Sequence, residues 1–149
     1  MEKGMTFKTN KLFKSLTFYE ESEDWFFLFA DKVYATSFKF WRLVKDNKIE
    51  AISHDHRHQF GLPNPLDLVE KVTQLLTGKI LLEIKVNKTT ADLTLILSDN
   101  IRIEIFIISV GYESYDLSIE DNRYIGLGGG ELGIVEKTDN PLILNTRKL

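Results

Sequence analysis

All three histidines of the chain lie in one short polar segment, His54-Asp55-His56-Arg57-His58. If this segment is extended, the three imidazoles project to the same side, a spacing that can chelate a transition metal. The alternative is a surface loop in which Asp55 or His56 ties down the backbone. Because no thiolate and no obvious fourth ligand accompany the histidines, we expect no stoichiometric metal and no cofactor. His54, His56 and His58 are then candidate contact residues for a partner.

A second candidate segment is Gly111-Tyr112-Glu113-Ser114-Tyr115. Gly111 permits a bulge or turn at the entry to a strand, which would point Tyr112 and Glu113 outward at the end of a sheet. Tyr112 could equally lie at the rim of the core. Ser114 stands in no nucleophile-elbow pattern, so the sequence assigns no catalytic residue. Tyr112 and Glu113 join the histidines as candidate contact residues.

The chain has one run of glycines, Gly128-Gly129-Gly130. Glycine-rich loops can bind phosphate through backbone N–H groups, but a phosphate loop would continue with Lys, Ser or Thr. Here Glu131 follows, so a tight bend between strands is the better interpretation.

Acidic residues gather in an early segment that contains Glu20, Glu21, Glu23 and Asp24. A carboxylate cluster of this kind can bind a cation or the basic surface of a partner. The ordinary interpretation is a solvated turn between two strands, and we expect that structure here.

The elements that must position these residues are mostly strands. From 80 to 119, apolar and polar residues alternate, which is typical of strands with one buried face. The tripeptide Ser98-Asp99-Asn100 predicts a tight turn between two of them. We therefore predict an antiparallel β-meander over 80–119. Its inward-facing residues would be Ile80, Leu82, Ile84, Val86, Leu93, Leu95, Leu97, Ile101, Ile103, Ile105, Ile107, Tyr115, Leu117 and Ile119.

One amphipathic helix is predicted over 65–77. Asn64 can cap it, Pro65 suits its first position, and Gly78 can end it in a left-handed conformation. Its apolar stripe should pack on the buried face of the meander, which makes the fold α+β. The stripe consists of Leu68, Val69, Val72, Leu75 and Leu76.

Additional strands are predicted on both sides of these elements. The aromatic N-terminal third favours strands at 16–19 and 25–29, and the second, a continuous apolar run, should be covered on both faces. Asp46-Asn47 predicts a hairpin that returns over 48–53. Strand pieces are expected within 123–135, and 142–144 could add an edge strand.

Composition limits the class of protein. A chain of 149 residues with 43% apolar content is most simply a single domain, 1–149. Its net charge of −3 argues against sequence-independent binding to nucleic acid. The absence of cysteine fits a reducing cytoplasm, and no apolar run is long enough to cross a membrane.

An ordered set of short motifs runs through about residues 38–135. In this order they resemble a family of small bacterial proteins of unknown function. Family patterns favour Trp where this chain has Tyr115 and a small residue where it has Arg57. The resemblance implies a bacterial, cytosolic domain without established catalytic residues, similar in character to toxin-neutralising immunity proteins. The motifs are Trp41-Arg42-Leu43 with Asp46, Asp55-His56, Phe60-Gly61-Leu62-Pro63, Asp92-Leu93, Gly111-Tyr112-Glu113-Ser114 and Gly128-Gly129-Gly130.

The expected function is a non-catalytic protein-interaction domain of the immunity type. Its acidic balance would suit a basic toxin as partner, because complementary charge speeds encounter. The alternative is a small metal- or ligand-binding enzyme centred on His54, His56 and His58. We further predict that these histidines converge with Tyr112 and Glu113 on one rim, so that function lies on a surface rather than in a deep pocket.

Overall fold

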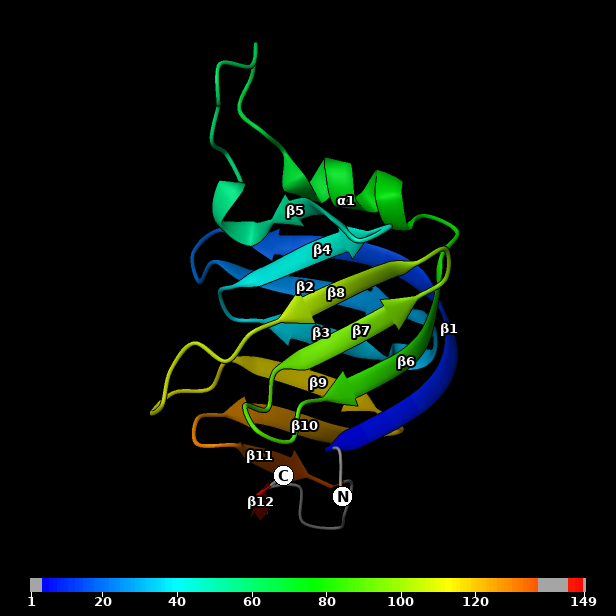
Figure 1. Cartoon of the computed structure of the whole chain (residues 1–149), viewed down its shortest axis with the longest axis vertical. Coiled ribbons are helices and arrows are strands. Elements are labelled where there is room, and N and C mark those ends of the chain that lie inside the picture. Colours follow the sequence, from blue (N-terminus) through cyan, green and yellow to red (C-terminus); the bar gives the residue numbers. More distant parts are fainter. Residues whose placement is uncertain (1–3, 137–144, 149) are drawn as a thin grey trace.

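Twelve strands form one antiparallel sheet in the computed structural model, which describes residues 4–136 and 145–148 (Figure 1). The order of the strands is β12-β11-β10-β9-β3-β2-β1-β6-β7-β8-β4-β5. One α-helix, α1 (Leu68–Leu76), and two 3-10 turns, η1 (Ala30–Lys32) and η2 (Ser53–Asp55), complete the described elements. The strands are β1 (Met5–Tyr19), β2 (Asp24–Phe29), β3 (Tyr34–Ser37), β4 (Trp41–Lys45), β5 (Lys48–Ile52), β6 (Ile80–Val86), β7 (Leu93–Leu97), β8 (Ile101–Ile105), β9 (Tyr115–Ile119), β10 (Asn122–Leu127), β11 (Glu131–Val135) and β12 (Asn145–Lys148).

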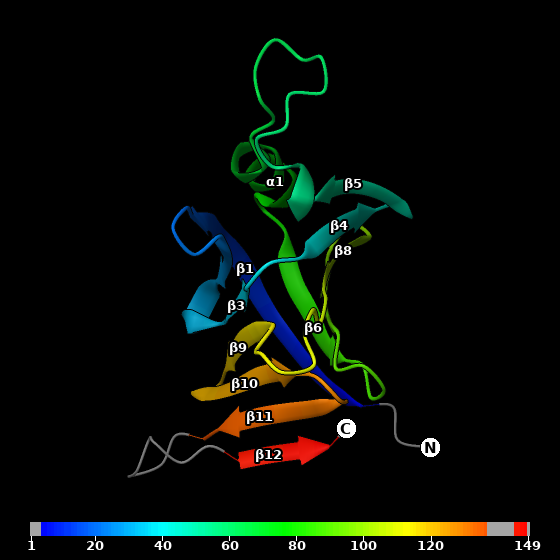
Figure 2. The ribbon, with the colours of Figure 1, turned by 90° about the vertical axis from the view of Figure 1, so that its left-hand side faces the viewer.

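The long strand β1 divides the sheet into two arms that face each other (Figure 2). Its residues 5–12 pair with β6, and its residues 13–19 pair with β2. The pairing shifts register once on each side, between Lys8 and Lys11 and between Phe13 and Ser15. Such irregularities bend a strand and increase its twist, which lets one strand belong to both arms.

The core lies between the two arms. One arm contributes aliphatic residues such as Leu43, Leu95 and Ile103, and the other contributes Phe27 and Leu117. All five side chains are fully buried. The alternation in strands β7, β8 and β9 therefore has the cause that the sequence predicted, one buried face on each strand.

The meander is confirmed for β6, β7 and β8, which are neighbours in chain order, and corrected in two places. First, β9 does not pair with β8 but lies between β3 and β10 in the opposite arm. Second, a register shift between Leu81 and Glu83 buries Leu81 and leaves Leu82 44% exposed. Because a bulge adds one residue to a strand, it reverses which side chains point inward, and simple alternation cannot detect it.

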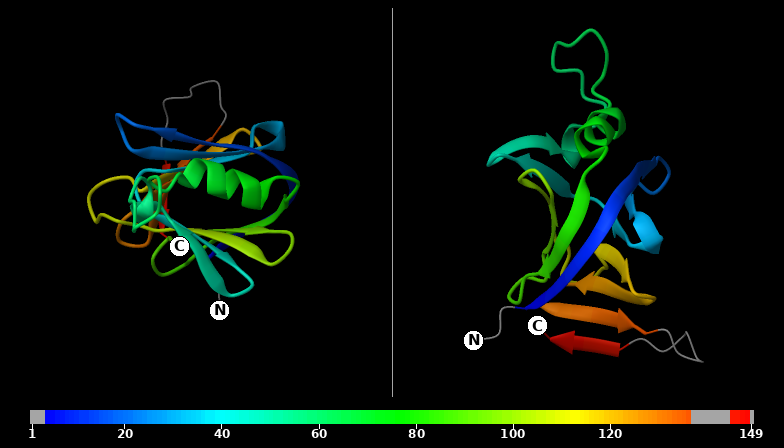
Figure 3. Two further views of the ribbon diagram at one scale, coloured as in Figure 1. Left: turned by 90° about the horizontal axis from the view of Figure 1, so that it is seen from above. Right: turned by 90° about the vertical axis from the view of Figure 1, so that its right-hand side faces the viewer.

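Helix α1 closes one end of the space between the arms (Figure 3). It buries Leu68, Val72 and Leu76, as the apolar stripe predicted. Its predicted start was wrong by three residues, because the side chain of Asp67, not Asn64, caps the helix by accepting from the N–H of Glu70.

The backbone hydrogen bonds of Leu66, which precedes the cap, explain why the helix begins later than predicted. The N–H of Leu66 donates to the carbonyl of His58, and the carbonyl of Leu66 accepts from the N–H of Arg57, so neither group is available for a helical turn. At the other end the helix stops at Leu76, and Gly78 adopts the expected left-handed conformation with a φ of 81°.

Several hairpin turns of the described chain contain pairs of non-glycine residues with positive φ between neighbouring strands. Among them are Asp46-Asn47, Asp99-Asn100 and Glu120-Asp121, and turns at the first two were predicted from sequence. Strand β2 alternates rather than being covered equally on both faces. The expected strand at 142–144 lies outside the described residues. Within the described part of the chain, no helix is long and apolar enough to cross a bilayer.

Candidate functional site

The histidine segment is a turn, not an extended strand. Residues 53–55 form η2, and His56 follows as its C-cap. The Nδ1 atom of His56 accepts a hydrogen bond of 3.1 Å from the backbone N–H of Leu68, the first residue of α1. His56 thereby satisfies one of the N–H groups that a helix start leaves without a partner, so its structural role is clear.

The surroundings of His56 favour its neutral form. Its ring contacts the rings of Phe18 and Trp25 edge-on, each with a centroid distance of 4.9 Å. Burial among these rings, helped by the positive charge of Arg57, lowers the pKa of His56 below its ordinary value. Because Nδ1 accepts from Leu68, the neutral ring carries its proton on Nε2.

His54 and His58 are exposed and contact each other, with ring centroids 5.3 Å apart. The ring of His58 also contacts that of Phe60. In the described parts of the chain, no three His, Asp or Glu side chains are arranged to hold a metal ion. The turn at η2 explains this, since it removes the alternation on which the predicted chelating geometry depended.

Arg57 connects the histidine segment to the acidic turn between β1 and β2. Its guanidinium forms an ion pair with Glu20 and lies 5.4 Å from the ring centroid of Phe18. One member of the acidic cluster therefore neutralises Arg57, and the predicted turn is present at 20–23.

A cavity of about 350 Å³ lies beside the histidines. Three connections surround it: the β1–β2 turn, the β3–β4 connection at residues 38–40, and the segment that begins at η2. Its lining combines aromatic rings with charged groups, and all three histidines take part. The lining residues are Phe18, Glu20, Glu23, Trp25, Lys39, Phe40, Ser53, His54, His56, Arg57 and His58.

Tyr112 and Glu113 lie in the loop 106–114, which projects from the same edge of the molecule between β8 and β9 (Figure 1). Tyr112 is 80% exposed and Val110 is 95% exposed. Ser109 orders the tip, because its Oγ accepts from the N–H groups of Gly111 and Tyr112, both at 3.0 Å. The loop therefore presents large apolar side chains on a backbone that is locally hydrogen-bonded.

The base of this loop is held from both sides. The N–H of Ile107 donates to Asp92 at 2.8 Å, and the N–H of Ile108 donates to Oγ of Ser114 at 3.0 Å. Ser114 is buried, so its hydroxyl has a structural role in the loop. Next to it, the buried hydroxyl of Tyr115 donates to the carbonyl of Ala91 at 2.8 Å.

The glycine run forms the turn between β10 and β11 and packs against the same loop. A methyl group at Gly128 would lie 2.6 Å from the carbonyl oxygen of Ser109 and would also overlap the Cα of Val110. Gly129 and Gly130 have positive φ. The bend predicted from sequence is present, and its first glycine lets the turn approach the loop closely.

Segment 38–40 connects the loop to the cavity. The N–H of Phe38 donates to the carbonyl of Ser114, and the carbonyl of Phe40 accepts from the N–H of Phe106. Phe40 also lines the cavity and contacts the ring of Phe106. Tyr112 and Glu113 themselves do not line the cavity, so the candidate residues form two adjoining regions rather than one continuous site.

Sequence reasoning missed several residues of these regions. Val110 follows an apolar run that predicts a continuation of the strand. Lys39 and Phe18 belong to no motif. Phe60 was named only as part of the motif Phe60-Gly61-Leu62-Pro63, and it is 64% exposed in the loop 59–66, which projects beyond α1 (Figure 3). A signal for the loop exists in the sequence, because Ser109-Val110-Gly111 interrupts the strong alternation of β8.

Comparison with known proteins identifies no relative. No family model, no curated protein and no solved structure matches this chain significantly. The resemblance to small bacterial proteins of the immunity type therefore stays a prediction.

Proposed function

We propose that this chain is a non-catalytic protein-interaction domain that binds its partner through the loop 106–114. The observation that carries the proposal is the exposure of Val110 and Tyr112 at the tip of a hydrogen-bonded loop. Exposed apolar side chains that cluster on one projection are typical of interaction sites. A loop already ordered before binding loses less conformational entropy when the partner binds.

Tyr112 is the expected anchor of this contact. A tyrosine side chain offers a large apolar area with a polar tip, and it orders few rotatable bonds on binding. Glu113, which is also exposed, adds a negative charge directly beside it. Together with the net charge of −3, Glu113 supports a partner with a basic surface, such as the toxin of an immunity pair.

The test measures the binding of this protein to basic proteins that are encoded by neighbouring genes. Tyr112→Ala should weaken binding by a factor of about 30 or more, as for an interface anchor of roughly 2 kcal/mol. Glu113→Ala should mainly slow association and reduce its dependence on salt. Both variants should keep the melting temperature of the parent. If both bind as the parent does, or if both unfold, this loop is not the interaction site.

A ligand-binding enzyme centred on the histidines is the second candidate. The cavity beside them supports ligand binding, since all three histidines contribute to its lining. His56, however, is committed to the start of α1 through its Nδ1 atom. Conversion of a small substrate that is lost in His54→Ala and His58→Ala, while both variants stay folded, would favour this enzyme over the interaction domain.

A further inference from the structure

The cavity beside the histidines contains charged groups that have no part in the interaction proposed for the loop 106–114. Two cations, Lys39 and Arg57, and two anions, Glu20 and Glu23, line it. Arg57 and Glu20 neutralise each other in an ion pair. Among residues 4–136 and 145–148, neither Lys39 nor Glu23 is placed in an ion pair, so one cation and one anion are available to a ligand.

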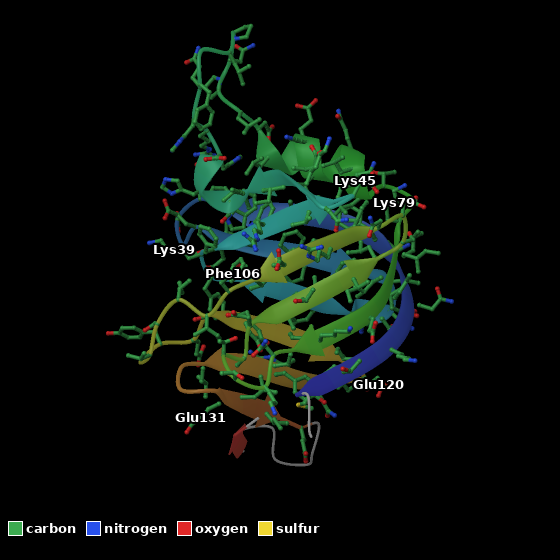
Figure 4. The ribbon with its side chains drawn as sticks, in the orientation of Figure 1. Lys39, Lys45, Lys79, Phe106, Glu120 and Glu131 are labelled. Atoms are coloured by element: carbon green, nitrogen blue, oxygen red, sulfur yellow. The ribbon has the colours of Figure 1, made fainter. Side chains whose placement is uncertain are left out.

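The positions of these two residues are fixed by their backbones. Lys39 lies between Phe38 and Phe40, and each of these neighbours is hydrogen-bonded to the loop 106–114 or its base. Figure 4 shows Lys39 at this edge of the molecule, on the opposite side from Lys45 and Lys79. Glu23 closes the β1–β2 turn, where its N–H donates to the carbonyl of Tyr19 at 2.7 Å. The two charges therefore enter the cavity from different connections.

Aromatic rings form the apolar part of the cavity. Trp25 is 2% exposed, and its ring contacts the rings of Phe18, Trp41 and His56. Phe40 contributes from the β3–β4 connection. Because the ring of Trp25 is part of the core, this wall is rigid and exists before a ligand arrives.

We propose that this cavity binds a free α-amino acid with an aromatic side chain. Lys39 would bind the carboxylate, Glu23 would bind the ammonium group, and the ring would pack against Phe18 and Phe40. A polyanion fits poorly, because two carboxylates line the cavity. A simple cation fits poorly, because Lys39 and Arg57 line it too. A volume of about 350 Å³ suits a small ligand of this kind.

Calorimetric titration with L-phenylalanine tests the proposal. Two comparison ligands each carry the aromatic ring with only one of the two charged groups. 3-Phenylpropionate keeps the carboxylate, and phenethylamine keeps the ammonium group. L-Phenylalanine should bind about three- to tenfold more tightly than either, as expected for one further charge-assisted contact near the surface. Equal binding of either comparison ligand, or no binding of L-phenylalanine, would overturn the proposal.

Two variants and a control assign the contacts. Lys39→Met should reduce the preference for L-phenylalanine over phenethylamine, and Glu23→Gln should reduce its preference over 3-phenylpropionate. Lys45→Met, on the opposite edge, should bind as the parent does. Binding that tolerates both cavity variants would show that the ligand lies elsewhere. Since this titration involves no protein partner, its outcome is independent of the interaction proposed for the loop.

Discussion

The loop 106–114 and the cavity beside the histidines adjoin through segment 38–40, yet they are built in opposite ways. The loop exposes its apolar side chains, and its shape depends on backbone N–H groups that donate to the hydroxyl oxygens of Ser109 and Ser114. The cavity keeps its largest ring, Trp25, inside the core and places charged groups around it. An exposed loop is thus separated structurally from a concave site that is built partly on the core.

Because the two regions are built differently, they should tolerate different substitutions. Side chains at the tip of the loop have few neighbours, so their removal changes recognition more than stability. The ring of Trp25 lines the cavity and also joins the two arms of the sheet through its contact with Trp41, so its removal changes both. Function at the loop is consequently easier to isolate by mutation than function at the cavity.

The largest expected effect separates the two regions by stability alone. Trp25→Ala should lower the free energy of unfolding by about 3–5 kcal/mol, because it empties space in the core. Val110→Ala should change it by less than about 0.5 kcal/mol, because that side chain is almost fully exposed. Chemical denaturation of both variants provides the measurement. A large loss in Val110→Ala would mean that the loop is packed and that the comparison is wrong.

The next prediction concerns the close approach of the glycine turn to the loop. Gly128→Ala should cost about 1–3 kcal/mol, since the added methyl group overlaps the backbone at Ser109 and Val110. Gly111→Ala is the matched control: nothing lies within 4 Å of the added methyl group, and the φ of Gly111 is not positive. Amide spectra should show shifts throughout 106–114 only in the first variant. Equal stability of the two would show that the turn does not support the loop.

Much of this architecture could be predicted from local sequence signals. The alternation of β7 and β8, the turn at Asp99-Asn100 and the apolar stripe of α1 all reflect neighbours along the chain. The partner of β9 could not be predicted in this way, because its pairing with β3 joins residues far apart in sequence. The bulge at Leu82 also escaped, since it depends on how β6 pairs with β7.

The candidate residues were predicted less completely than the fold. The histidines were found because they are rare and adjacent, but the bond from Leu68 to His56 depends on where α1 begins. Glu23 was named from sequence as part of the acidic cluster, but Lys39 carries no motif, and only the folded chain brings the two to one cavity. The predicted rim is therefore two adjoining regions, and the role of Tyr112 and Glu113 in binding stays a prediction.

A smaller effect on stability is expected when the hydroxyl groups of the two tyrosines in the loop region are removed. Tyr115→Phe should cost roughly 1–2 kcal/mol, because it leaves the buried carbonyl of Ala91 without its donor. Tyr112→Phe should leave stability unchanged, because its hydroxyl belongs to an exposed residue. Thermal unfolding of the two variants compares an interior and an exposed tyrosine three positions apart. Similar losses in both would contradict the exposure of Tyr112.

The smallest expected effect is a pH dependence of the free energy of unfolding, which should arise from His56 in the cavity and not from the loop. The folded state lowers the pKa of His56, so in the unfolded chain this group takes up its proton at a higher pH. As the pH falls through about 6.5, the unfolded state binds more protons, and the free energy of unfolding decreases until the folded state is protonated as well. Protonation also removes the Nδ1 lone pair that accepts from Leu68, which weakens the start of α1.

Denaturation curves at pH 8, 7, 6 and 5 should therefore show a loss of stability that His54→Gln retains and His56→Gln lacks. The carboxyl groups of Asp31 and Asp99 do not confuse this window, because Lys11 and Lys79 lower their pKa values and their contribution is lost only in more acidic solution. A parent whose stability is constant between pH 8 and 5 would show that His56 titrates alike in both states, and the cavity would then lack the burial ascribed to it.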